Sequence, residues 1–453
     1  MAERMRSAIA PTYLFACLLI GGSAQGVWQN ALLQLVGVGI IAWVAMQRGA
    51  QPLTPAARQL LIIAIAVLVL FALQAVPLPR GVFGGGIRNR IHDDLQLLGL
   101  VSAKAPLSLA PYQTLASLLT LIPPLAVFCA AVGMPGVRPR AMAAALLAGT
   151  FAGILLGALQ VASAQPEQSP WYLYSQTNLG AAVGFFANAN HMATLLVVCI
   201  PFLAAILAAA RSANLQRYSA VAAITAGAGL VIAVGIFLNR SLAGYLLALP
   251  VVAASALIVL PGGSRLRGAL AGLGVLLVAG ALAALSSSAI GSSKLGAEAS
   301  TSVQSRAEIL ATTGRAIADF FPWGSGIGTF REVYPLYENI NTVSTTYVIH
   351  AHNDYAEILL ETGIFGVLLL VAFLIWWVVA VWRVWRTAEA GAFARAASIA
   401  SGAILLHSFV DYPLRTAAVA SVFALCLALL AGNRAPRPVE STDLRPTRHV
   451  DLR

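Results

Sequence analysis

Apolar residues fall in long runs along this chain, and short polar links separate the runs. A helix needs roughly 20 apolar residues to cross a bilayer core about 30 Å thick, and about twelve stretches approach or reach that length. They lie near residues 8–24, 28–47, 59–77, 113–133, 141–162, 189–210, 218–237, 242–260, 266–288, 358–382, 396–410 and 416–432. The pattern predicts an all-α, polytopic integral membrane protein with about twelve transmembrane helices.

Composition supports this class and changes how the charge is interpreted. Hydrophobic residues make up 59% of the 453-residue chain and charged residues 10%, whereas a soluble domain carries about 25% charged residues. A net charge of +11 would suit a nucleic-acid partner, but arginines gather in alternate links, as the positive-inside rule requires. These include Arg4, Arg6, Arg48, Arg58, Arg138, Arg140, Arg211, Arg217, Arg265, Arg267, Arg383, Arg386 and Arg395. We therefore expect no nucleic-acid partner and cytoplasmic N- and C-termini.

The links on the opposite side are longer and differ in character. Residues 1–433 are expected to form one membrane domain, and residues 434–453, rich in Pro, Arg and Thr, have the composition of a disordered cytoplasmic tail. Outside the membrane, residues 77–112 suggest an interfacial amphipathic helix. Residues 163–188 are aromatic and nearly uncharged, which fits either a headgroup belt or glycan stacking. The segment of about residues 289–357 is the largest and carries most of the outside charge.

This largest segment contains one helical pattern and one glycine pattern. Residues 305–320 predict a helix that ends before Pro322. Its expected common face consists of Ile309, Leu310, Thr313, Ile317 and Phe320. Gly324, Gly326 and Gly328 then predict a tight turn, because no preceding strand supports a phosphate-binding loop.

The stretch from His350 to Glu361 holds the densest set of titratable residues. His352 precedes an apolar run and is a candidate general base, although a hydrogen-bonding role at the helix start is the alternative. His350 could form a metal pair with it, but no further ligands gather nearby, and we expect no metal. Asp354, Glu357 and Glu361 occupy successive turns of one helix face. They could orient the histidine or bind substrate hydroxyls.

Arginines bordering the membrane on this side are candidate anion ligands, because a guanidinium matches phosphate oxygens. Arg240 stands between two apolar runs, where a snorkelling role is the alternative. Arg306 begins the predicted helix, where an ordinary pair with Glu308 is equally plausible. Arg315 and Arg331 are weaker candidates.

Two further polar sets lie at helix ends. Asn188 and Asn190 begin the run at 189–210, where they either pack against polar helices or line a cavity. His407, Asp411 and Arg415 lie between the last two runs, and we expect them to form a structural ion-pair set.

Several motifs occur in an order that resembles the bacterial O-antigen ligase family. The resemblance covers about residues 110–430. The motifs are Phe186-Ala-Asn-Ala-Asn190, Asn239-Arg-Ser241, Ser305-Arg306, Pro322-Trp-Gly-Ser-Gly-Ile-Gly-Thr-Phe330, His350-Ala-His-Asn-Asp-Tyr355 and Glu361-Thr-Gly363. The superfamily also contains O-antigen and exopolysaccharide polymerases and some protein O-oligosaccharyltransferases. The Asn-Arg-Ser-Leu sequence around Arg240 departs from the family's common Ser-Arg-Gly.

The resemblance implies an inverting glycosyltransferase of the bacterial inner membrane that needs no metal or cofactor. Such an enzyme takes a glycan from undecaprenyl diphosphate and transfers it, at the periplasmic face, to a hydroxyl of lipid A–core or of another glycan. By this resemblance His352 is the catalytic base, and Arg240 and Arg306 bind the diphosphate. Supporting candidates are Asn188, Asn190, Arg331, His350, Asp354 and Glu357. The alternatives are a polymerase using the same donor, a transporter or flippase, and a non-catalytic export scaffold.

Overall fold

The computed structural model consists almost entirely of helices. It describes residues 2–24, 26–47, 53–79, 86–100, 104–134, 136–213, 215–260, 294–340, 347–387 and 390–432, with short pieces between 268 and 280. Within these residues the only sheet is an antiparallel pair of β1 (Leu78–Pro79) and β2 (Lys104–Ala105). The predicted all-α class is confirmed. The expected cytoplasmic tail at 434–453 lies outside the described residues.

Eight described helical stretches are long and apolar enough to cross a membrane. These are α2 (Trp28–Met46), α3 (Pro55–Ala75), the pair α5 (Pro111–Thr120) and α6 (Ile122–Gly133), α7 (Pro139–Val161), α8 (Ala189–Ala213), α9 (Leu215–Asn239), α10 (Leu242–Val259) and α14 (Asp354–Arg386). Three more apolar stretches are shorter: the part Arg6–Ile20 of α1 (Ala2–Ile20), α15 (Ala392–His407) and α16 (Ala417–Ala431). A multi-pass membrane protein is thus confirmed. The count of about twelve is not, because the run at 266–288 lies mostly outside the described residues.

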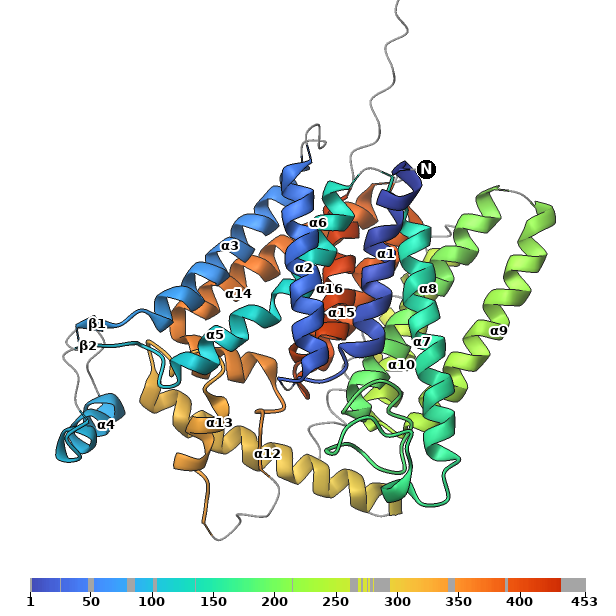
Figure 1. The fold of residues 1–453 in the computed structure, drawn as a ribbon. Helices are drawn as coiled ribbons and strands as arrows, with labels where there is room; N and C mark the ends of the chain where they lie inside the picture. The colour runs from blue at the N-terminus through green and yellow to red at the C-terminus, as the bar shows by residue number, and fades with distance from the viewer. Residues whose placement is uncertain are drawn as a thin grey trace, which may run out of the picture.

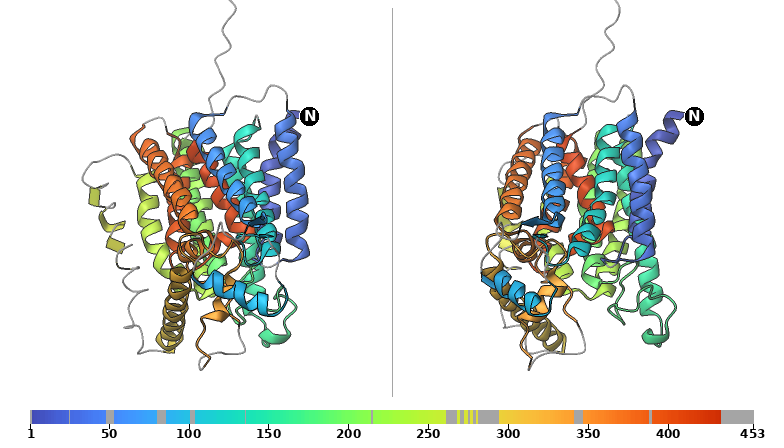
Figure 2. Two further views of the ribbon diagram at one scale, coloured as in Figure 1. Left: turned by 90° about the vertical axis from the view of Figure 1, so that its left-hand side faces the viewer. Right: turned by 60° about the vertical axis from the view of Figure 1, so that its left-hand side comes forward.

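The helices pack side by side around α8 and α16 (Figures 1 and 2). α8 contacts α9, α10 and α15, whereas α16 contacts α1, α6 and α15. Small residues allow the close approaches that stabilise helices within lipid. At Gly149 of α7, for example, an added Cβ would lie 2.6 Å from Leu18 Cδ1 of α1. Because α16 contacts α1, the first and last apolar helices of the chain are neighbours.

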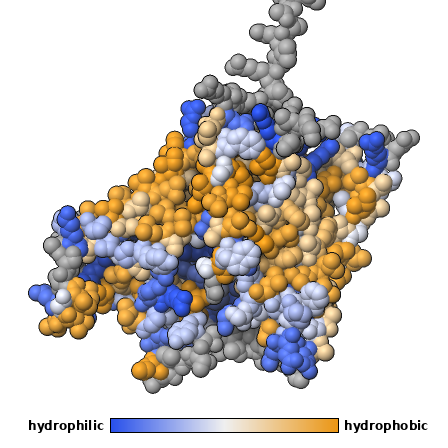
Figure 3. Space-filling model, viewed as in Figure 1, coloured by the Kyte–Doolittle hydropathy of each residue, from blue (hydrophilic) through white to orange (hydrophobic). Residues whose placement is uncertain are grey.

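Polar segments gather at one end of this bundle, and the N-terminus lies at the other (Figures 1 and 2). α12 (Lys294–Phe320) crosses the polar end, with α13 (Phe330–Val333) beside it. On the face drawn in Figure 3, a broad hydrophobic band gives way to hydrophilic residues toward that end. The 163–188 segment, which contains a short 3₁₀ helix η2 (Pro166–Gln168), lies there as well.

The predicted helix at 305–320 is confirmed, but its predicted face needs correction. Ile309, Thr313 and Phe320 are buried, whereas Leu310 is 43% exposed. Thr312 and Ala316 are buried in its place. The core of this segment therefore follows a face rotated slightly from the one that hydrophobicity alone indicated, because α12 packs against α14 and the short 3₁₀ helix η4 (Tyr334–Leu336).

The turn after α12 that contains Gly324, Gly326 and Gly328 packs closely against a kink in α14. Gly324 has φ 80° and Gly363, inside α14, has φ 57°. An added Cβ at Gly324 would lie 2.6 Å from the Glu361 carbonyl oxygen, so glycine is required for this approach. The Ser325 amide donates to the Leu360 carbonyl at 2.8 Å, and the Ile364 amide donates to the Pro322 carbonyl at 2.9 Å. The turn thereby fixes the first two turns of α14, which position the site.

A helix is present within 77–112 as expected, namely α4 (Gly86–Leu97), and its interfacial position stays a prediction. It projects from the bundle beside the β1–β2 pair (Figure 1). Arg88 ties it to the glycine turn: its Nη2 donates to the Gly324 carbonyl at 2.5 Å, and its guanidinium lies 5.7 Å from the Phe320 ring centroid. Leu97 is 87% exposed, as a helix lying on a lipid surface requires.

Candidate active site

Asp411 is the residue on which the polar end of the bundle converges. It lies in the link between α15 and α16, and its side chain is fully buried. Asp411 Oδ2 accepts a hydrogen bond from Asn190 Nδ2 of α8, and Oδ1 lies 3.2 Å from His352 Nδ1. Arg306 Nη2 of α12 lies 4.0 Å from Oδ2. One carboxylate thus joins segments that are far apart in the sequence.

The surroundings of Asp411 favour its ionised form. Burial opposes ionisation, but the hydrogen bond from His352 and the positive charge of Arg306 outweigh it and hold the pKa of Asp411 well below its usual range. The Tyr412 amide also donates to Oδ1, at 2.9 Å. Asp411 is therefore an anion that can orient and stabilise a neighbouring cation.

His352 is held in an unusual backbone conformation. Its φ of 50° lies in the left-handed region, which is costly for a residue with a Cβ and is concentrated at functional sites. Asp411 occupies its Nδ1, so that nitrogen carries the proton and Nε2 is the acceptor. Its side chain is 27% exposed. This geometry suits a general base that a substrate hydroxyl can reach.

Arg240 shows the same backbone feature, with φ 58°. It is exposed and immediately precedes Ser241, whose hydroxyl donates to Asn190 Oδ1 at 2.7 Å. Asn190 in turn donates to Asp411, so the Arg240 backbone is tied to the same network. Among the described residues, the Arg240 guanidinium makes no ion pair. The structure therefore brings His352 and Arg306 together through their shared partner Asp411, and Arg240 is linked to Asp411 only through Ser241 and Asn190.

A second buried cluster surrounds Arg415, which lies in the 3₁₀ helix η5 (Pro413–Arg415). Arg415 Nη2 lies 3.2 Å from Glu357 Oε1 and 3.2 Å from Glu361 Oε2, and Nε lies 3.6 Å from Asp354 Oδ1. All three acids come from the start of α14. The predicted His407–Asp411–Arg415 ion-pair set is thus wrong in its partners, because the chain folds Arg415 against α14 instead.

This second cluster supports the histidine segment. Glu357 Oε1 lies 2.8 Å from His350 Nδ1, and Glu357 Oε2 accepts from the Ala351 amide at 2.9 Å. Glu357 therefore orients His350 and not His352. Ser408 Oγ donates to Asp354 Oδ2 at 2.8 Å. Because Asp354, Glu357 and Glu361 are engaged and buried, they act here as supports for the loop that carries His352.

Tyr412 packs among three histidines. Its ring centroid lies 4.2 Å from that of His350 and 5.0 Å from those of His352 and His191. Asn188 Nδ2 donates to the Tyr412 hydroxyl at 3.5 Å. Burial, and then the charge of Asp411, raise the pKa of Tyr412, so its hydroxyl stays protonated. Both asparagines of the predicted pair thus face the polar network.

Two of the arginine candidates lie apart from this network. Arg331, on α13, is exposed, and no interaction between it and the site is seen within the described residues. Arg315 Nη2 donates to the Tyr337 carbonyl at 3.0 Å and to Thr312 Oγ1 at 3.1 Å, which is a structural role. In the part of the chain that the structure describes, no group of His, Cys, Asp and Glu is arranged to hold a metal ion.

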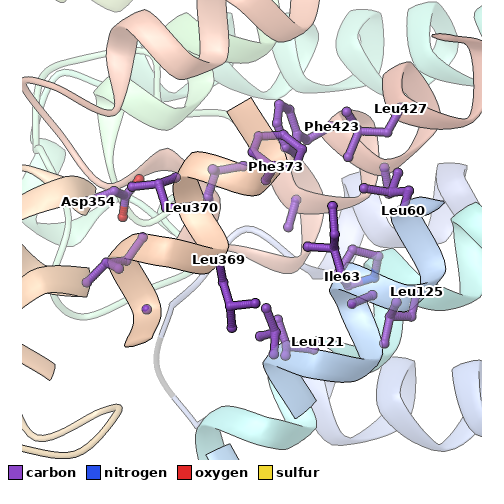
Figure 4. A pocket seen from close by; sticks show the side chains of 18 of the residues that line it. Leu60, Ile63, Leu121, Leu125, Asp354, Leu369, Leu370, Phe373, Phe423 and Leu427 are labelled. Atoms are coloured by element: carbon purple, nitrogen blue, oxygen red, sulfur yellow. The ribbon is translucent and has the colours of Figure 1, made fainter. Parts of the chain in front are cut away.

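An apolar cavity of about 360 Å³ opens beside the site, between α3, α6, α14 and α16. Its walls are mostly aliphatic and aromatic, and include Leu60, Ile63, Leu121, Leu125, Leu370, Phe423 and Leu427. Asp354 and Leu427 lie toward opposite ends of it (Figure 4). Since Asp354 comes two residues after His352, the cavity leads from the apolar bundle toward the polar site.

The sequence named His352, Arg306 and Asn190 as candidates, and the structure places them together with Asp411 and Tyr412, which were not expected at the site. An ionisable residue between two apolar helices is rarely placed there without a function, and that signal pointed to Asp411. The sequence pattern suggested a local ion pair for Asp411, but in the fold its carboxylate reaches α8, α12 and the loop that carries His352.

Together the fold and the site define a multi-pass membrane protein with a histidine–carboxylate pair and arginines at one end of its bundle. Residues 227–371, which include Arg240, Arg306 and His352, match a family described as O-antigen ligase. This match bears out the resemblance seen in the motifs and supports the superfamily of O-antigen ligases and polymerases. The match supports an activity of the glycosyltransferase-like ligase or polymerase type. None of the curated proteins matches the chain.

Proposed function

We propose that this protein transfers a glycan from undecaprenyl diphosphate to an acceptor hydroxyl at the periplasmic face of the inner membrane. The observation that carries the proposal is the placement of His352 and Arg306 on one buried carboxylate, Asp411. A base for the acceptor and a cation for the leaving group then lie on either side of the same residue. A site at the periplasmic face corresponds to N- and C-termini in the cytoplasm.

The reaction follows from these roles. His352 Nε2 takes the proton of the acceptor hydroxyl, and the oxygen attacks the anomeric carbon. The bond from that carbon to the diphosphate breaks, and the electron pair leaves with the diphosphate. Attack from the side opposite the leaving group inverts the anomeric centre. A positioned base contributes roughly 10²–10⁴-fold to such a step.

Asp411 holds the imidazole so that Nε2 is unprotonated before the reaction, and its charge stabilises the imidazolium that forms. Arg306, at 4.0 Å, is loosely paired with Asp411 and 23% exposed, so it can also reach a phosphate oxygen. Arg240 is exposed, and the next residue, Ser241, donates a hydrogen bond to Asn190. Two guanidinium groups would stabilise the charge that develops on the leaving diphosphate.

The apolar cavity supports a lipid-linked donor. Its lining is almost entirely hydrocarbon, which suits a polyprenyl chain. Asp354, at one end of the cavity (Figure 4), follows His352 by two residues in the chain. A lipid held there would present its diphosphate toward the polar end of the bundle. A nucleotide-activated sugar would not use such a cavity.

A ligase and a polymerase would share this donor chemistry and differ in the acceptor. We favour a ligase that uses lipid A–core, on the general layout of the motifs; the alternative is a polymerase that extends a lipid-linked glycan. A deletion strain separates them by its surface glycans. Lipid-linked polymer with none on lipid A–core indicates a ligase, whereas accumulation of single repeats indicates a polymerase.

The direct test is glycan transfer in reconstituted vesicles with a defined lipid-linked donor. We expect His352→Ala to abolish transfer while donor binding persists. Arg315→Ala is the matched control on α12, because that arginine contacts Thr312 and Tyr337 and not the site. Full activity of His352→Ala would remove the proposed base. A transporter would move glycan or lipid across the vesicle membrane in this assay without forming a new glycosidic bond. A non-catalytic export scaffold would form no new glycosidic bond either.

A further inference from the structure

A second pocket, of about 310 Å³, lies between the start of α2 and the 163–188 segment. We call it the Gln29 pocket. Its polar wall consists of Ser23, Trp28, Gln29, Tyr174, Ser175 and Gln176. The volume falls at the lower end of the roughly 300–1,000 Å³ typical of small-molecule sites, which is room for a single compact ligand.

The chemistry of this wall excludes two kinds of ligand and favours a third. None of the described residues that line the pocket is charged, so they offer a phosphate no counter-charge. Its apolar residues, Val27, Leu173 and Ala187, are too few to surround an acyl or prenyl chain. Amide groups can both donate and accept hydrogen bonds, and aromatic rings offer flat apolar faces. This combination matches a neutral ring that carries several hydroxyls and has an apolar face.

Gln29 supplies independent evidence that something polar binds here. Its Oε1 is buried and, among the described residues, has no hydrogen-bond partner. Buried polar atoms in folded proteins are nearly always paired, and an exception calls for an explanation. The half-buried Gln29 side chain would have to rotate toward the pocket for a ligand hydroxyl to donate to Oε1 and provide the missing bond. Trp28, beside it in the wall, is 70% exposed and presents an open ring.

The pocket is connected to the proposed active site through the chain itself. The amide of Ala187 donates to the Gly22 carbonyl at 3.2 Å, and the next residue, Asn188, donates to the Tyr412 hydroxyl. Tyr412 follows Asp411 directly. The pocket therefore lies at the polar end of the bundle, where a glycan reacting at His352 would extend.

From these observations we propose that the Gln29 pocket binds one sugar residue of a glycan substrate, away from the reacting bond. The inference rests on the proposed function, since it takes glycans to be the substrates. Either the donor glycan or the acceptor glycan can supply such a sugar. Its role is to set the register and identity of the glycan and not to act on the bond that forms.

The experiment measures transfer kinetics in vesicles while donor and acceptor concentrations are varied separately. Gln29→Ala and Gln176→Ala each remove one amide, and Gln176 is exposed, so its variant leaves the fold intact. We expect the KM of one substrate to rise about five- to tenfold per variant, with kcat unchanged. The substrate whose KM rises identifies the source of the sugar. Trp171→Ala is the matched control, because this exposed residue of the same segment does not line the pocket.

The proposal is overturned if wild-type protein transfers glycan and both glutamine variants keep both KM values. If the wild type transfers nothing, the proposed function fails, and the pocket is then tested by titration with a soluble oligosaccharide of the organism's own polysaccharide. Binding that weakens in Gln29→Ala but not in Trp171→Ala supports the sugar site. Equal binding by the two variants, or none by the wild type, contradicts it.

Discussion

Replacing Asp411 with asparagine tests the proposed chemistry at its centre, because the change removes one charge and keeps the side-chain shape. Oδ1 lies 3.2 Å from His352 Nδ1, and two unit charges at that distance interact by about 5 kcal/mol at an effective dielectric constant of about 20. Water at the 27% exposed His352 weakens this. We take about 3 kcal/mol, which corresponds to a roughly 10²-fold lower rate.

The assay is single-turnover transfer in reconstituted vesicles, with kcat and the donor KM measured separately. We expect Asp411→Asn to lower kcat about 10²-fold and to leave the donor KM unchanged or lower it, because Arg306 loses a competing anion. Asp319→Asn is the matched control: this carboxylate is exposed and accepts from the Tyr337 hydroxyl at 2.9 Å. Wild-type turnover by Asp411→Asn would refute the role assigned to this carboxylate.

Three further predictions follow from other parts of the structure. Arg240→Ala should weaken donor binding about tenfold without changing acceptor binding, as a titration with undecaprenyl diphosphate would measure; equal donor affinity would remove this arginine from the clamp. Gly324→Ala should destabilise the fold by about 1–3 kcal/mol, because φ is 80° and a Cβ would lie 2.6 Å from the Glu361 carbonyl oxygen. Thermal unfolding measures this change in stability. Gly314→Ala is the control and should be neutral or stabilising, because a Cβ there meets nothing within 4 Å. The lowered pKa of Asp411 stabilises the fold fully above the unfolded value of about 3.9 and ceases to do so as pH falls through the lower folded value. The wild type's advantage in unfolding temperature over Asp411→Asn should therefore be constant near neutral pH and shrink only in acid, and a loss beginning near neutral pH would contradict the assignment.

Much of the fold could be predicted from the sequence because lipid imposes both length and apolarity on a spanning helix. The runs near 28–47 and 141–162 correspond closely to α2 and α7. Finer features depend on packing. The run at 113–133 divides at Leu121 into α5 and α6, and the buried face of α12 includes Thr312 and Ala316, which hydropathy did not select.

The candidate site divides in the same way. His352 and Arg306 were predictable because titratable groups at the mouth of a bundle are costly unless they serve a purpose. The partner of His352 was not, because Asp411 lies 59 residues away and only the packing of α15 against α8 brings it there. For the same reason the sequence could not show that Arg415 pairs with three acids of α14.

The proposed chemistry requires that Arg240 and Arg306 hold one diphosphate beside His352, the base for the acceptor hydroxyl. An electron cryo-microscopy structure of the protein in lipid nanodiscs with undecaprenyl diphosphate tests this most directly. We predict density for the diphosphate within hydrogen-bonding distance of both guanidinium groups, with the terminal phosphate group, whose oxygen would carry the glycan, on the side of His352 Nε2. Diphosphate density that contacts neither arginine, or that lies on the other side of the membrane from His352, would contradict it.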